Sequence, residues 1–387
     1  MSKWEKVRLG DVATVVSGST PKTSVKEYWN GHLNWITPAE LQEDIHIVYE
    51  TQRKITEKAV MDTGLNLLPR GTVLLSSRAP IGKVAIAGVE MYCNQGFKNL
   101  VCSEKLYNQY LFWFLKRNTE FLNSLGRGAT FKEISKSIVE NIQIPLPPLS
   151  VQQKIANDLN LVSELIKIRK QQLFELDNLI KSFFYELFGL QEKCDEKPLI
   201  DIIVEGAGLS YGIVQPGEDV GTGVGIIRPI DIKDGEISYD DIKRVPPHIE
   251  EPYKRTRLSG NEILITVRGS TGDTALTDER CQGMNVTRGI AVIRQNDEIV
   301  NRVYLNQYLR SEQSQKYIQQ NTKGATLKQL NLSALKKMLI PLPPLELQNK
   351  FADIVAKIEE QKALVKKAVD ETQLLFDSLM SQYFDGS

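Results

Sequence analysis

The sequence carries the same plan twice, and this repeat constrains the fold more than any other feature. The segment GATFKEISKSIVENIQIPLPPLSVQQKIANDL begins at Gly128, and GATLKQLNLSALKKMLIPLPPLELQNKFADIV begins at Gly324, 196 residues later. Further upstream, LPRGTVLLSSRAPIGKVA from Leu68 matches LSGNEILITVRGSTGDTA from Leu258 at an offset of 190 residues. Two such copies account for nearly all of the 387 residues. We therefore expect a tandem duplication without a separate catalytic domain.

Each copy has a globular part. Residues 1–147 and 190–343 mix short β-rich runs with Gly, Pro, Asn and Ser punctuation and a few helical segments. This pattern predicts two similar globular domains of the α/β (α+β) class. Trp35 and Ile226 occupy equivalent positions in the two copies, and we expect both in the core.

Each copy ends in a segment of a different kind, residues 148–189 and 344–387. Apolar residues recur there in a 4-3 alternation from Ile155 to Leu187 and from Phe351 to Tyr383. Seams sustained over more than four heptads predict two long coiled-coil helices. The natural partner of each helix is the other one, and the spacing alone allows parallel or antiparallel pairing. Charged residues interrupt both seams, and they either set the register or face solvent; they are Arg169 and Lys362.

Proline residues mark where these helices start. In the first copy, Ser150 with Gln153 three residues later predicts a capping box. In the second copy, Glu346 lies at the equivalent place and favours the helix dipole instead.

Composition narrows the class of protein. The chain has 48 basic and 48 acidic residues, with a net excess of four basic residues in 1–147 and of three acidic residues in 344–387. A formal charge of zero predicts weak DNA binding by this chain alone, because phosphate contacts depend on Lys and Arg. The four cysteines form no C-x-x-C pair, and only three histidines are present. We expect no disulfide, no metal site, no membrane span and a cytoplasmic location.

At this point the sequence resembles a known family. Two globular halves, each followed by an IPLPPLxxQxK motif and a long amphipathic helix, are similar to the specificity subunits of type I restriction–modification systems. The opening W-x-x-V-x-L-G-D, from Trp4 to Asp11, also looks like the start of this family. The resemblance covers the whole chain.

The resemblance implies a fold and a function. It implies target recognition domains at 1–147 and 190–343, each reading one part of a bipartite site in double-stranded DNA. It implies that the helices at 148–189 and 344–387 pack antiparallel as spacers that set the gap. Two modification subunits would dock on the helices and methylate adenine with S-adenosylmethionine, and restriction subunits would be able to join. The chain itself would hold no cofactor and perform no catalysis.

Glycine turns near the end of each globular domain are candidate DNA contacts. The turns at Gly128 and Gly324 are followed by T-x-x-E and T-x-x-Q, which is typical of a capped helix start. A helix N-terminus beside basic residues binds phosphate, whereas an ordinary capped helix needs no ligand. The DNA-binding interpretation includes Arg127, Thr130, Lys132, Lys323, Thr326 and Lys328.

Two equivalent arginines, Arg78 and Arg268, follow β-rich runs and precede glycines. An arginine at a strand end either binds guanine O6 and N7 or a phosphate, or pairs with an acidic residue of the same chain. The sequence leaves both interpretations open. Lys83 and Thr271 adjoin the same glycines and belong to the same hypothesis.

Three further segments are candidates, each with an ordinary surface turn or a core role as the alternative. Thr37 and Arg228 lie at equivalent positions before prolines. A Gly/Ser/Pro loop near the N-terminus and a basic cluster in the second copy would reach a groove or a phosphate; they contribute Ser19, Thr20, Lys22, Lys254, Arg255 and Arg257.

Two other classes of function remain to be compared with DNA reading. A non-catalytic coiled-coil adaptor would show no DNA affinity with or without a methyltransferase. An enzyme in each half should repeat its reactive residues, yet none of the three histidines has a histidine at the equivalent position. The enzyme is therefore disfavoured.

Overall fold

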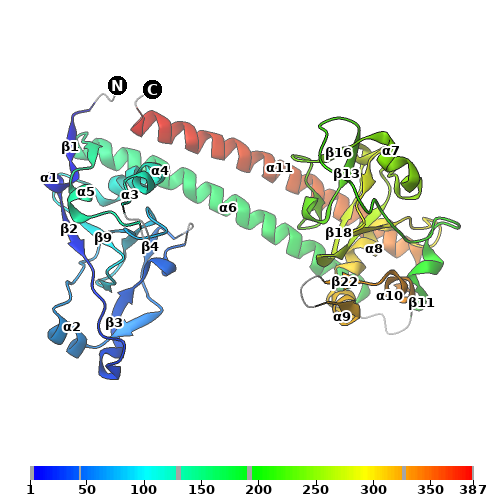
Figure 1. Ribbon diagram of the computed structural model, residues 1–387, viewed down its shortest axis with the longest axis horizontal. Helices are drawn as coiled ribbons and strands as arrows, with labels where there is room; N and C mark the ends of the chain where they lie inside the picture. The colour runs from blue at the N-terminus through cyan, green and yellow to red at the C-terminus, as the bar shows by residue number, and fades with distance from the viewer. Residues whose placement is uncertain (1–3, 43–44, 128–131, 190–193, 325–327, 386–387) are drawn as a thin grey trace. The chain divides into compact units, whose positions relative to one another are not determined.

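A computed structural model of the protein describes residues 4–42, 45–127, 132–189, 194–324 and 328–385 (Figure 1). The chain divides into two compact units. The first unit contains Met1–Lys170 and Lys367–Ser387, and the second contains Gln171–Lys366. Two 40-residue helices, α6 (Leu149–Phe188) and α11 (Leu345–Phe384), each contribute one part to each unit.

The globular part of the first unit is built on two small sheets. The larger has the strand order β2 (Ala13–Ser17), β9 (Lys98–Cys102), β6 (Val73–Leu75), β7 (Val84–Ala87), β4 (Ile47–Val48). The smaller has the order β5 (Arg53–Ile55), β3 (Trp29–Ile36), β8 (Tyr92–Cys93), and β1 (Lys6–Arg8) pairs with β10 (Gln143–Pro145). The helices are α1 (Leu9–Val12), α2 (Glu57–Thr63), α3 (Asn108–Arg117), α4 (Thr119–Ser124) and α5 (Lys136–Glu140), with short 3₁₀ turns at η1 (Lys26–Tyr28) and η2 (Pro38–Glu40).

The second unit repeats the smaller sheet and the core of the larger one. Its larger sheet has the order β12 (Ser210–Tyr211), β20 (Ile290–Ile293), β17 (Ile263–Arg268), β22 (Gln329–Leu330), β21 (Thr322–Lys323), with β18 (Ser270–Leu276) also paired to β17. Strands β12, β20, β17 and β18 pair as β2, β9, β6 and β7 do. The smaller has the order β16 (Lys243–Val245), β13 (Val224–Ile227), β19 (Asn285–Val286); two strand pairs complete the unit, β14 (Ile232–Lys233) with β15 (Glu236–Ile237) and β11 (Asp195–Pro198) with β23 (Leu339–Leu342). The helices are α7 (Pro247–Glu250), α8 (Arg302–Leu309), α9 (Glu312–Asn321) and α10 (Leu332–Lys337), with 3₁₀ turns η3 (Leu199–Ile202), η4 (Pro229–Asp231), η5 (Glu251–Thr256) and η6 (Glu279–Cys281).

The cores lie where the apolar runs predict them. Trp35 and Ile226 are 1% and 0% exposed, which confirms their expected core role. The central strands β6 and β17 are buried along their length up to the arginine that follows or ends them. Mixed α/β units of this kind confirm the predicted fold class.

Within each unit the two long helices run antiparallel, which settles the direction that the spacing left open. In the first unit, Tyr383 donates a 2.8 Å hydrogen bond to Asp158 near the start of α6, and Arg169 donates to Thr372 further along. In the second unit, Phe184 packs on Phe351 with their ring centroids 5.6 Å apart. Positions of the predicted seams are buried or half-buried throughout both helices, as a heptad seam requires.

The charged residues in the seams make contacts between the helices. Arg169 also donates to the carbonyl oxygen of Ala368. Lys362, with 9% of its side chain exposed, lies 2.7 Å from Asp177 and 2.9 Å from Glu359. Glu359 lies on the same helix as Lys362, whereas the contacts of Arg169 with α11 and of Lys362 with Asp177 cross between the helices. The crossing contacts form only when the helices are paired in one alignment, so both residues favour one register.

A buried glutamine in each copy holds the start of each long helix. The Gln152 amide donates to the carbonyl oxygens of Pro147 and Lys105, both at 2.9 Å, and its oxygen accepts from the Tyr107 backbone N–H at 2.8 Å. In the second copy, Gln348 donates to the Pro343 carbonyl at 2.8 Å and accepts from the Asn301 backbone N–H at 2.8 Å.

The predicted Ser150–Gln153 capping box is wrong. Helix α6 begins at Leu149, so Ser150 already lies inside its first turn. The chain enters the helix directly from Pro148, whose carbonyl oxygen accepts from the Gln152 backbone N–H at 3.0 Å.

Candidate nucleic-acid interface

The first unit gathers several predicted residues at the end of its central strand. Arg78 follows β6 and donates a 3.0 Å hydrogen bond to Glu133. Lys98, at the start of β9, donates to the other oxygen of the same carboxylate at 3.1 Å. Backbone bonds of 3.1 and 3.0 Å pair Arg127 with Glu133, and Lys132 is exposed beside it. We call Arg78, Lys98, Arg127, Lys132 and Glu133 the first cluster.

The second unit builds the equivalent arrangement from equivalent residues. Arg268 ends β17 and donates a 2.8 Å bond to Gln329, which stands 196 residues after Glu133. Strand pairing places Lys323 opposite Gln329, and the Lys328 carbonyl accepts from Gly269 at 3.0 Å. We call Arg268, Thr271, Lys323, Lys328 and Gln329 the second cluster; its Thr271 accepts from Thr322 at 3.3 Å.

The two clusters differ in charge balance. Partial burial raises the pKa of the Glu133 carboxyl, but hydrogen bonds from Lys98 and Arg78 outweigh this and hold the pKa below its ordinary value. Arg78 is therefore paired with an acid of its own chain, as one interpretation of the sequence predicted, and it shares that carboxylate with Lys98. Arg268 instead binds a neutral amide and keeps its full charge. In both clusters the outer basic residues are exposed: Arg127, Lys132, Lys323 and Lys328.

The predicted helix starts at these glycine turns are wrong. Helix α5 begins at Lys136 and is capped by Ser135, and α10 begins at Leu332 and is capped by Asn331. The residues before them pair as strands with the ends of β6 and β17, because those strand ends offer free backbone groups. The phosphate hypothesis thus rests on exposed side chains and no longer on a helix N-terminus. Thr130 and Thr326 lie outside the described residues.

Lys83 lies beside the first cluster. Its backbone N–H donates 2.9 Å to the Ser76 hydroxyl, and its carbonyl oxygen accepts from the Ser76 N–H at 2.9 Å. Ser76 directly follows β6, so the turn from Arg78 to Lys83 closes on this strand end.

The N-terminal loop of the first unit lies against a different turn, residues 94–96. Ser19 donates its backbone N–H to the Cys93 carbonyl at 3.0 Å, and the Thr20 hydroxyl donates to the Gln95 amide oxygen. Lys22 is exposed further along this loop. The loop is thus more than a bare surface turn, because Ser19 is held on Cys93, which directly precedes the 94–96 turn, and Thr20 is held on Gln95 within it.

Thr37 and Arg228, the equivalent residues that precede a proline in each copy, both bind an acidic residue of the same chain. The Thr37 hydroxyl donates 3.0 Å to Glu40, and its backbone N–H donates 2.9 Å to the same carboxylate. The Arg228 guanidinium binds both oxygens of Asp231 at 3.0 and 2.8 Å. Both side chains start a 3₁₀ turn, and this local role accounts for them without DNA.

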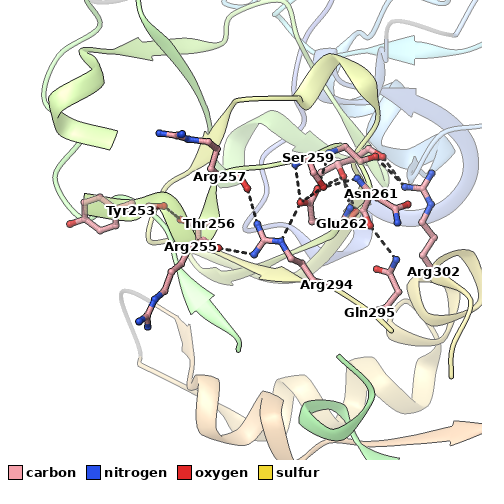
Figure 2. Close-up of polar contacts among 12 residues, drawn as sticks. Tyr253, Arg255, Thr256, Arg257, Ser259, Asn261, Glu262, Arg294, Gln295 and Arg302 are labelled. Atoms are coloured by element: carbon pink, nitrogen blue, oxygen red, sulfur yellow. Dashed lines mark hydrogen bonds and ion pairs between the residues drawn. The ribbon is translucent and has the colours of Figure 1, made fainter. Parts of the chain in front are cut away.

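The basic segment of the second unit, residues 254–257, is held by an ion pair between Arg294 and the buried Glu262. Figure 2 shows Arg294 reaching the carbonyl oxygens of Arg255 and Arg257, at 2.7 Å each, while its Nε lies 3.4 Å from Glu262. The Glu262 carboxylate is 1% exposed and accepts from Ser259, Gly260, Asn261 and Thr277. The backbone of the basic segment is therefore fixed.

The side chains of this segment divide into paired and free ones. Arg257 binds the buried Glu250 through two nitrogens, and Lys254 pairs with Glu251 on the surface. The Arg255 side chain points away from the network in Figure 2 and is exposed. Of these three residues, Arg255 is the one whose guanidinium is available to a phosphate.

Sequence reasoning missed three polar residues at these strand ends: the buried Lys98 and the exposed Gln95 and Arg288. Each residue precedes or begins a buried strand, and in the sequence a polar residue at such a place indicates only where the strand starts. The available signal was the pair Gln95-Gly96 and Arg288-Gly289 at an offset of 193 residues. Among the described residues, no group of three His, Cys, Asp or Glu is placed to hold a metal ion, and no helix is long and apolar enough to cross a membrane.

Comparison with known proteins identifies the family. The family model described as the type I restriction modification DNA specificity domain matches residues 1–178 and 230–372. The chain is 28% identical to the type I restriction enzyme MjaIX specificity subunit of Methanocaldococcus jannaschii, over 99% of this chain and 93% of that protein. It is 27% identical to the EcoBI specificity subunit of Escherichia coli, over 76% and 68%. The chain belongs to the type I restriction–modification specificity-subunit family.

Solved structures share the fold. A crystal structure of the S subunit of a type I restriction–modification system from M. genitalium matches with a TM-score of 0.60 and 17% identity, covering 99% of this chain and 96% of that one. A second structure, described as showing complex assembly and conformational transition of the type I system, matches with the same TM-score at 19% identity. The family and these structures agree with the resemblance drawn from the sequence, and the adaptor alternative is not favoured.

Proposed function

We propose that this chain reads a bipartite sequence in double-stranded DNA for a type I restriction–modification complex. The observation that carries the proposal is that one site is built twice. Each unit sets an arginine at the end of its central strand and surrounds it with exposed basic residues, in the first and second clusters. Two similar readers on one chain each contact one set of base pairs, and the paired helices set the number of unread pairs between them.

In this proposal the chain supplies sequence choice and no chemistry. Two modification subunits hold S-adenosylmethionine and methylate adenine, restriction subunits are able to join them, and the assembly works in the cytoplasm. The near-zero net charge supports a shared interface, because a neutral chain releases few counterions by itself. Partner subunits would supply many of the phosphate contacts.

An exposed apolar stripe on α6 supports docking of a modification subunit. Leu161, Leu165 and Ile168 are 72%, 38% and 55% exposed and are spaced four and three residues apart on one face of the helix. A partner that covers this stripe would gain stability from it, since burying a fully exposed leucine or isoleucine side chain stabilises by about 1.5–3 kcal/mol and these three keep a part of that surface exposed. A helix of a modification subunit is the partner that we expect there.

The test is to co-express the chain with its methyltransferase subunit in a host without other adenine methylation, and to map methylated adenines across the genome. A split motif with a fixed gap is expected. Absence of methylation, with the soluble complex recovered, would refute the proposal. An adaptor would give a complex without any DNA affinity.

Two changes of the chain separate the roles of its parts. Inserting one heptad into each helix adds about 10 Å of helix, so the gap should widen by no more than about three base pairs while both half-sites stay the same. Exchanging residues 1–147 for the corresponding part of another family member should change one half-site only.

A further inference from the structure

The turns at residues 94–96 and 287–289 are the same structure in the two units. Three backbone N–H···O=C bonds hold the first turn. The N–H of Asn94 donates to Ile36 at 3.1 Å, and that of Ser19 donates to Cys93 at 3.0 Å. The N–H of Ser77 donates to Gly96 at 2.7 Å. In the second, the equivalent bonds run from Thr287 to Ile227, from Ile213 to Val286 and from Val267 to Gly289, at 3.0, 2.8 and 2.7 Å.

Close backbone packing holds both turns in place. A Cβ atom at Gly18 would lie 2.0 Å from the Asn94 carbonyl oxygen, and one at Gly212 would lie 1.8 Å from the Val286 carbonyl oxygen. Only glycine permits this approach in either unit. Each turn is therefore fastened to the neighbouring loop and to the end of the central strand, and it presents its middle residue on a fixed backbone.

The middle residues, Gln95 and Arg288, are both exposed, and they differ. The Gln95 amide oxygen accepts from Thr20, which leaves its NH₂ group and a second lone pair available. Among the described residues no hydrogen bond or ion pair engages the Arg288 guanidinium. The neighbouring arginines Arg228 and Arg268 are bound to Asp231 and Gln329.

Each turn also adjoins the arginine cluster of its unit. The Ser77 and Val267 bonds attach the turns to the residues that directly precede Arg78 and Arg268. The protein backbone of each turn is fixed, and its middle side chain differs between the two units. This side chain is therefore suited to contact bases, while the neighbouring basic residues are suited to contact DNA phosphates.

We propose that Gln95 and Arg288 are equivalent base-reading residues, with Gln95 selecting an adenine in one half-site and Arg288 a guanine in the other. This inference rests on the proposed function. Glutamine matches the N6 donor and N7 acceptor of adenine, and arginine matches the O6 and N7 acceptors of guanine, both in the major groove. Thr20 is a positioning residue, because its hydroxyl orients the Gln95 amide.

The test uses the full chain co-expressed with its methyltransferase subunit and maps methylated sites for each variant. Arg288→Ala should relax one G in one half-site by about fivefold or more and leave the other half-site unchanged. Gln95→Ala should relax one A in the opposite half-site, and Thr20→Val should weaken discrimination at that same A. Arg288→Gln should shift the preference at its position from G toward A. Gln153→Ala, at an exposed position on α6, is the matched control.

The outcomes distinguish this inference from the proposed function. If the unmodified complex methylates no split motif, the proposed function fails. If it does, and Gln95→Ala and Arg288→Ala leave the motif unchanged, base reading by this turn is refuted. Equal weakening at every position of the site, with a smaller salt dependence of DNA binding, would assign Arg288 to a phosphate and would also overturn the inference.

Discussion

Replacing the buried glutamine at the start of a long helix should loosen that unit. Gln152→Leu keeps most of the side-chain volume but removes all three hydrogen bonds of the amide, at 2.9, 2.9 and 2.8 Å. Because Gln152 is 0% exposed, water cannot replace them. At about 1 kcal/mol or slightly more for each lost bond, the free energy of unfolding of the first unit should fall by about 3–4 kcal/mol. For a unit of this size, that lowers the Tm by roughly 10 °C.

The duplication offers an internal comparison. Gln348→Leu removes two bonds, each 2.8 Å long, from an equally buried amide. The second unit should therefore lose about 2–3 kcal/mol, less than the first unit loses. Gln153→Leu is the matched control, since Gln153 is the exposed neighbour on the same helix and should change stability by no more than about 0.5 kcal/mol.

Hydrogen–deuterium exchange locates the effect, and urea unfolding measures it. Exchange of the Tyr107 amide should accelerate in the Gln152 variant, and exchange of the Asn301 amide in the Gln348 variant, because each N–H loses its acceptor. A loss below about 0.5 kcal/mol with unchanged exchange at Tyr107 would show that these bonds do not hold the helix start.

Three further predictions concern the helices and the second unit. Lys362→Ile should leave the Tm unchanged or raise it in calorimetry, because a buried charge is replaced by an apolar seam residue, whereas Asp177→Ala should lower it by removing a partner of that charge. Hydrogen bonds from Arg257 hold the pKa of Glu250 below its ordinary value. The stability that they contribute is present above the ordinary pKa of a glutamate and is lost as the pH falls through the lower pKa of the folded state. In Glu250→Gln, the free energy of unfolding should therefore fall less between neutral and acid pH than it does in the unchanged protein. Leu161→Asp, on the exposed stripe of α6, should reduce co-purification of the methyltransferase subunit without lowering the Tm.

Much of the architecture follows from local patterns. Heptad spacing depends only on residues three and four apart, so the seams from Ile155 and from Phe351 predict both long helices. The exact start of the first helix was not predictable in this way, because the capping-box signal placed it after Leu149. The repeat likewise predicted that the two globular parts share a fold, and it placed Trp35 in a core.

The candidate site was only partly predictable, because its contacts join residues far apart in sequence. Arg78 and Glu133 are 55 residues apart, and the sequence alone allowed an acid or a DNA group as the arginine's partner. The glycine turns failed for a related reason. T-x-x-E is a local helix signal, but strand pairing with the end of β6 uses the same backbone, and tertiary structure decided between them.

By itself, the sequence determined the duplication, the two seams and the family, since each of these is a short-range or repeated pattern. Only the tertiary structure decided the direction of helix pairing, which arginines pair with an acid of the same chain, and that Gln95 and Arg288 occupy equivalent turns. The physical reason is that a hydrogen bond or ion pair depends on positions within about 3 Å, and only the folded chain brings distant residues that close.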